Sequence, residues 1–146
     1  MKFAYAALGA LVAGAVAGWF WPASADESLP MDRPTSVGGI ETVCTGVGQE
    51  AQQDPRWESY PVRIELSNGG AQFLSGAHLV LTDSGGRELA NVDCEGSWVL
   101  FRVNPGAYKV TATLTHQPGG SRTARFSSPR SGQKLVVLGF SVAANR

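Results

Sequence analysis

The chain has 146 residues, with 12 Lys and Arg against 12 Asp and Glu, and it is 43% hydrophobic and 9% aromatic. This length suits one domain, and the apolar content suffices for a core. Together these values exclude a long disordered tail, a multidomain enzyme and a polybasic nucleic-acid binder, which needs an excess of Lys and Arg to contact phosphates.

The first 25 residues are expected to be a secretory signal peptide. Lys2 supplies one positive charge, residues 4–21 carry none and are mostly apolar, and Ala23 and Ala25 form an A-x-A cleavage site. This order of features is typical of exported precursors. The alternative is an uncleaved membrane anchor, because the apolar stretch approaches the length of a span. We therefore predict a periplasmic or secreted protein, cleaved after Ala25, that meets a membrane only if this segment is retained.

Residues 26–38 are polar and contain two prolines, so we expect a flexible leader, followed by one domain over residues 39–146. Between the first two strands of that domain, residues 48–59 are expected to form a loop with one helical turn, capped by Asp54 and with Pro55 at its first position. Short apolar or alternating runs bounded by Gly, Pro and Asn turns predict eight strands. They cover residues 40–47, 60–67, 77–82, 87–93, 97–103, 108–115, 122–127 and 134–140.

These strands recur about every ten residues, and no long helical period interrupts them. This spacing predicts an all-β fold, an immunoglobulin-like antiparallel β-sandwich of about seven to eight strands. The run at residues 97–103 is apolar on both faces, which is typical of a central strand.

Cys44 and Cys94 are the two cysteines of the chain. Export would place them in an oxidising compartment, where an even pair usually forms a disulfide. The alternative is a pair of buried free thiols. The spacing is not that of a redox C-x-x-C motif.

Two segments carry a resemblance to a known family. Residues 74–86 (LSGAHLVLTDSGG) and residues 101–110 (FRVNPGAYKV) resemble the carboxypeptidase regulatory-like domain. That family is similar to the transthyretin-like, or prealbumin-like, sandwiches, and the resemblance extends over about residues 38–140. It implies an exported single-domain member whose motif residues are structural. The ring of Tyr108 is then expected to pack inward and its hydroxyl to bond a backbone group.

Catalysis and metal binding receive little support from the sequence. The only histidines are His78 and His116, and neither has the neighbours of a zinc ligand, so we expect no metal and no other cofactor. A small hydrolase would need a cleft in which one of these histidines meets an acid such as Glu65 or Asp93.

Binding is the better candidate activity. Arg56, Trp57, Tyr60 and Trp98 combine aromatic rings with a cation, as sugar and peptide sites do, and are the candidate ligand-binding residues. The alternative is that Trp57 folds back as a lid over one end of the sandwich. The strand at residues 122–127 could also accept an added strand, although Arg122 and Arg125, expected on one face, would protect it.

The sequence as a whole predicts a non-catalytic exported module that binds or scaffolds an unknown partner, a periplasmic protein or a glycan. A carbohydrate- or peptide-binding module is the alternative, and a small hydrolase is the remaining hypothesis. The sequence names neither the ligand nor the oligomeric state.

Overall fold

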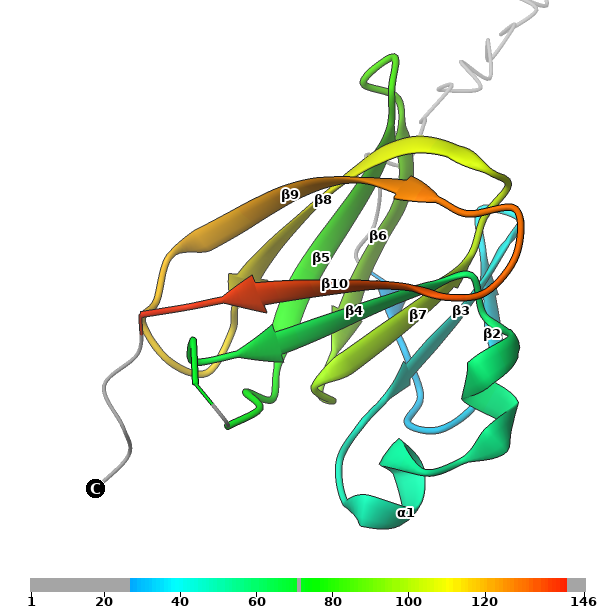
Figure 1. Cartoon of the computed structure of the whole chain (residues 1–146). Helices are drawn as coiled ribbons and strands as arrows, with labels where there is room; N and C mark the ends of the chain where they lie inside the picture. Colours follow the sequence, from blue (N-terminus) through cyan, green and yellow to red (C-terminus); the bar gives the residue numbers. More distant parts are fainter. Residues whose placement is uncertain (1–26, 71, 142–146) are drawn as a thin grey trace, which may run out of the picture.

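The computed structural model describes residues 27–70 and 72–141, which form two five-stranded sheets packed into a β-sandwich (Figure 1). This confirms the predicted all-β fold. The first sheet has the order β1 (Glu27–Ser28), β6 (Glu88–Cys94), β5 (Ala77–Asp83), β8 (Gly106–Leu114) and β9 (Ser121–Ser128). The second sheet has the order β10 (Lys134–Gly139), β4 (Val62–Ser67), β7 (Trp98–Arg102), β3 (Ile40–Thr45) and β2 (Thr35–Val37). In the described ranges, no helix has the length and apolar character needed to cross a membrane.

The sheets are mixed rather than purely antiparallel, which corrects one part of the prediction. β1 runs parallel to β6, and β10 runs parallel to β4, whereas the other pairs are antiparallel. The reason for the second exception lies in the connection before β10. The chain leaves β9 at the edge of the first sheet and crosses to the second sheet, so β10 arrives beside β4 in the same direction instead of forming a hairpin with β9.

The described part of the predicted leader belongs to the sandwich. Residues 27–28 form β1 and residues 35–37 form β2, so the described residues form ten strands rather than seven or eight. Leu29 and Val37 are buried in the core between the sheets. Strands of two or three residues are too short to show an alternating pattern, and the polar residues around these two apolar anchors conceal them.

The interior follows the expected alternation. On β5, Leu79 and Leu81 are buried, whereas the alternate residues His78 and Val80 are partly exposed on the other face. β7 is the central strand of its sheet, as predicted, and is buried from Trp98 to Phe101 on both faces. The Tyr108 hydroxyl donates to the Asn104 carbonyl at 2.8 Å, and its ring stacks on Phe126, which confirms the structural role expected for it.

The second face of β7 is covered by the segment between β3 and β4. This segment contains α1 (Gln49–Gln52) and the 3-10 helix η1 (Pro55–Ser59) (Figure 1). As predicted, Asp54 caps η1 by accepting from the Arg56 backbone N–H, and Pro55 stands at the first position. η1 brings Trp57 and Tyr60 onto Val43 and Leu100, forming a small second core outside the sandwich.

The predicted disulfide between Cys44 and Cys94 is confirmed. Cys44 lies on β3 and Cys94 on β6, so the bond joins the two sheets. The Gly96 N–H points at both sulfur atoms, at 3.3 Å from each. Residue 96 must be glycine here, because a Cβ atom would collide with the Thr45 backbone.

Candidate functional site

The aromatic residues predicted to bind ligand are buried. Trp57, Tyr60 and Trp98 expose only 2%, 3% and 5% of their surface, so none offers an open ring face to a sugar or peptide. The burial favours the alternative in which Trp57 is a lid. The lid covers the outer face of the second sheet, however, and not one end of the sandwich, because Trp57 packs on Val43 and Leu100.

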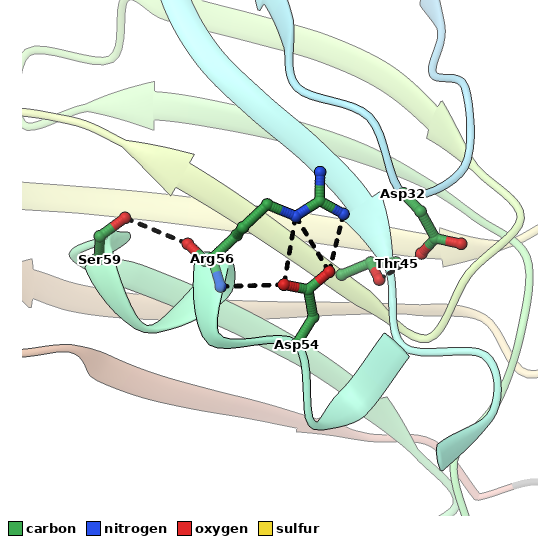
Figure 2. Close-up of polar contacts among 5 residues, drawn as sticks. All are labelled: Asp32, Thr45, Asp54, Arg56 and Ser59. Carbon is green, nitrogen blue, oxygen red and sulfur yellow. Dashed lines mark hydrogen bonds and ion pairs between the residues drawn. The ribbon is translucent and has the colours of Figure 1, made fainter. Parts of the chain in front are cut away.

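Arg56 is exposed, but its guanidinium is already occupied. It donates to both carboxylate oxygens of Asp54, with its closest contact at 2.7 Å (Figure 2). It also lies 4.5 Å from the centre of the Trp57 ring. The hydrogen bonds from Arg56 lower the pKa of the Asp54 carboxyl. Beside this pair, Thr45 donates to Asp32 at 2.6 Å (Figure 2). Arg56 thus stabilises the beginning of η1 through its contacts with Asp54.

Tyr60 anchors the other end of η1. Its hydroxyl donates to Glu41 Oε1 at 2.9 Å, and Arg102 donates to Glu41 Oε2 at 2.9 Å. The Arg102 guanidinium also lies 4.3 Å from the centre of the Tyr60 ring and donates to the Ser59 carbonyl. The hydrogen bonds from Tyr60 and then Arg102 lower the pKa of the Glu41 carboxyl.

Trp98 sits under a second cation, on the same outer face. The Arg63 guanidinium lies 4.3 Å from the centre of the Trp98 ring and 3.1 Å from Glu65 Oε1, and Phe73 meets the Trp98 ring edge-on. Glu65 is 8% exposed, and this burial raises the pKa of its carboxyl. The Trp98 ring is therefore covered by Arg63 and Phe73 on the outer face of the second sheet.

Glu65 and Glu41 are expected to have opposite effects on the pH dependence of stability. The pKa of Glu65 is raised in the fold, so the native state holds its proton more tightly and loses stability as pH rises through the unfolded and then the folded pKa. The pKa of Glu41 is lowered, so its contribution is present above the unfolded pKa and is lost as pH falls through the folded pKa. Urea unfolding between about pH 2 and pH 8 measures both effects, because the Glu41 contribution is lost below its unfolded pKa and the Glu65 contribution above it. E65Q should raise the neutral-pH free energy of unfolding relative to its low-pH value, whereas E41Q should lower the neutral-pH value only. Parallel profiles for both variants and wild type would contradict these assignments.

Among the described residues, both histidines lie close to acids. His78 Nδ1 lies 2.8 Å from Asp93 Oδ1 across the outer face of β5 and β6, and His116 Nε2 lies 2.5 Å from Glu95 Oε2. One contact that the hydrolase hypothesis required, between His78 and Asp93, is thus present. Two clefts, of about 560 and 340 Å³, lie at the end of the sandwich near Asp83 and Tyr108, and neither histidine lines them. Over residues 27–70 and 72–141, no three His, Cys, Asp or Glu side chains gather in a way that could hold a metal ion.

Charge is segregated along the chain, and this signal was missed because the total is zero. All 12 acids lie at or before Glu95. After that residue, the described chain carries only bases among its Asp, Glu, Lys and Arg residues, and they are Arg102, Lys109, Arg122, Arg125, Arg130 and Lys134. The last five are on β8, β9, β10 and the loop before β10, which lie at one side of the sandwich (Figure 1). Charge counted in blocks rather than over the whole sequence would have predicted a basic side.

The edge of the second sheet at β10 is apolar on its outer face. Leu135 and Val137 are 44% and 53% exposed, whereas the alternate residues Val136 and Leu138 are buried in the core. Within the described residues, β10 forms a ladder only with β4. We call the free side of β10 from Lys134 to Val137 the β10 edge.

The neighbouring strand β9 does not match the arrangement predicted for it. Arg122 and Arg125 lie on opposite faces, because they stand opposite Ala112, which is buried, and Lys109, which is not. An odd separation along a strand always has this effect. Arg122 donates to the Gly139 carbonyl at 2.9 Å, so it binds the far end of β10, and β9 and β10 lie next to each other without forming a ladder.

Comparison with known proteins assigns no relative. The chain matches no family model, and its sequence matches no curated protein.

Proposed function

We propose that the protein is a non-catalytic exported binding module that captures an acidic, extended segment of a partner protein at the β10 edge. The observation that carries the proposal is an edge strand with two exposed aliphatic side chains and bases around it. Sheet edges normally avoid added strands by placing charged side chains, prolines or bulges on them. On β10, Leu135 and Val137 occupy the outward positions where such protection would stand.

The backbone of the β10 edge is suited to an added strand. In a parallel pair, alternate residues direct both their N–H and C=O groups toward the partner strand. The N–H of Lys134 bonds Pro61 and that of Phe140 bonds Ser67, so the even-numbered residues face β4. Leu135 and Val137 therefore direct their backbone groups to the open side, where an incoming strand would pair with them and pack beside their side chains.

The surrounding charges favour an acidic segment. Lys134 begins β10, and Arg130 lies in the loop before it. Arg63 and Glu65 on β4 stand opposite Leu135 and Val137, but they form an ion pair with each other and add no net charge to the edge. Alternating acidic residues in a bound strand would complement these cations and increase the association rate at low salt.

The remaining parts of the proposal rest on the sequence. The predicted signal peptide supports a periplasmic or secreted location. The disulfide agrees with this location, because disulfides persist mainly in oxidising compartments. The resemblance to the carboxypeptidase regulatory-like domain, whose motif residues hold turns and core, supports a role without catalysis. A glycan is the less favoured partner, since the aromatic rings that would stack on sugars are buried.

Strand addition can be tested with synthetic eight-residue peptides that alternate Val with Glu, Lys or Ser. The Glu peptide is expected to bind most tightly, by about tenfold over the Lys peptide at low salt, and to shift the amide signals of Leu135 and Val137 in NMR titrations. V137P removes one edge N–H without touching the β4 ladder, and L135S/V137S removes the apolar contacts. Both variants should weaken binding by about tenfold or more.

V47S is the matched control, because Val47 is 52% exposed and lies in the loop before α1. Equal binding of the three peptides, or wild-type binding by V137P that retains its circular dichroism spectrum, would refute the proposal. A concentration-dependent dimer that V137P abolishes would instead show that the β10 edge binds a second copy of the chain.

A further inference from the structure

A separate feature, at the end of the first sheet, forms an open cleft of about 560 Å³. One wall is the turn between β5 and β6, from Asp83 to Gly86, and the other is formed by residues 107–109 of β8 and 125–127 of β9. This volume falls in the range of small-molecule sites. We call it the hairpin cleft, and it does not include β10.

Two cations stand side by side in the hairpin cleft. Thr82, Lys109 and Arg125 are direct partners across β5, β8 and β9, so their side chains share the outer face of the sheet. Like charges directly opposite one another destabilise a sheet. Among the described residues, neither Lys109 nor Arg125 forms an ion pair that would relieve this repulsion. An anion between them would do so.

Two nearby acids are engaged elsewhere. Glu88 stands opposite Thr82 on β6, and its carboxylate accepts a hydrogen bond from Asn91 Nδ2 at 3.4 Å. Asp83 stands opposite Tyr108, one position along from the Thr82–Lys109 pair, so it belongs to the other face of the sheet. Its Oδ1 atom accepts from the N–H groups of Gly85 and Arg87, which fixes the turn. The carboxylate therefore shapes the wall of the cleft instead of neutralising its cations.

We propose that the hairpin cleft binds a small ligand through an oxyanion, a carboxylate or a phosphate group. The planar guanidinium of Arg125 can donate two parallel hydrogen bonds to either group, and the Lys109 ammonium supplies a compact charge beside it. The hydroxyls of Ser84 and Ser127, both exposed and lining the cleft, are available to the rest of the ligand. This site is independent of the β10 edge and of the partner proposed for it.

The test is an NMR titration of the folded protein at constant ionic strength with inorganic phosphate, with citrate and with glycerol as the neutral control. Phosphate or citrate is expected to shift the amides of Thr82, Gly85, Lys109 and Ser127 in a saturable way, and glycerol is not. The stronger of the two anions identifies which source of the oxyanion the cleft prefers. Absence of saturation with both, or equal shifts at Arg130 and Lys134, would show only general attraction to a basic surface and would overturn the proposal.

Charge-matched variants separate the site from the surface. R125Q and K109Q are each expected to weaken anion binding by about tenfold, the effect of losing one charged hydrogen-bonding partner of roughly 1.4 kcal/mol. R87Q removes the same charge from the same hairpin but from a residue outside the cleft lining, and it should bind as wild type does. An equal loss in R87Q and R125Q would refute the site. Peptide binding at the β10 edge should be unchanged in K109Q, so the two proposals can fail separately.

Discussion

Removing the disulfide is expected to lower the free energy of unfolding by about 4 kcal/mol. Cys44 and Cys94 are 50 residues apart, so the bond closes a long loop and restricts the unfolded chain strongly. It also links β3 of the second sheet to β6 of the first, which no backbone ladder does. Guanidinium unfolding of wild type and of C44A/C94A measures the difference.

Reduced wild-type protein is the control for C44A/C94A, because it keeps the buried sulfur atoms and loses only the covalent bond between them. We expect it to lose most of the same stability, with the double Ala variant somewhat lower because of the cavity that the missing sulfur atoms leave. If reduced and oxidised proteins unfold at the same denaturant concentration, the bond adds nothing to the pairing of the sheets.

Trp57→Ala is expected to cost about 3–5 kcal/mol, the usual loss for a large buried aromatic side chain. The Trp57 ring contacts Val43 and Leu100 on the second sheet and meets Tyr60 edge-on at 6.1 Å between ring centres. Without it, the segment with η1 loses its anchor and the outer face of β7 meets water. Thermal and urea unfolding measure the loss.

R56A is the matched control, since Arg56 is the exposed neighbour of Trp57. Its pair with Asp54 lies at the surface, where water screens the two charges, so R56A should destabilise the protein far less than W57A does. A W57A variant as stable as R56A would show that the ring is not part of a core, and would restore Trp57 as a candidate ligand platform.

Alternation of apolar and polar residues proved sufficient to locate β3 to β10 in the sequence. The pattern worked because each of these strands has one face on the core, as Leu79 and Leu81 show on β5. It failed at β1 and β2, where two or three residues pair with neighbours that only the folded chain supplies. Parallel pairing of β10 with β4 was equally hidden, because it depends on where the chain crosses between sheets.

The candidate site shows a different limit of sequence reasoning. Trp57 stands among polar residues, and such surroundings suggest an exposed ring, but the polar neighbours face water while the ring turns to the sheet. Burial of one residue in a loop depends on the direction in which the loop folds, which local composition does not specify. The basic side and the exposed Leu135 and Val137 were readable in principle, the first from charge blocks and the second only once β10 was known to be an edge.

The pairing of β10 with β4 also constrains when the molecule can finish folding. β5 to β9 lie between β4 and β10 in the chain, so β4 is synthesised well before its neighbour. Until β10 is made, the backbone groups of β4 on that side can bond only to water or to another strand. Contacts so distant along the chain slow folding. Removing β10 would make β4 the edge strand of its sheet, with unpaired backbone N–H and C=O groups that promote association.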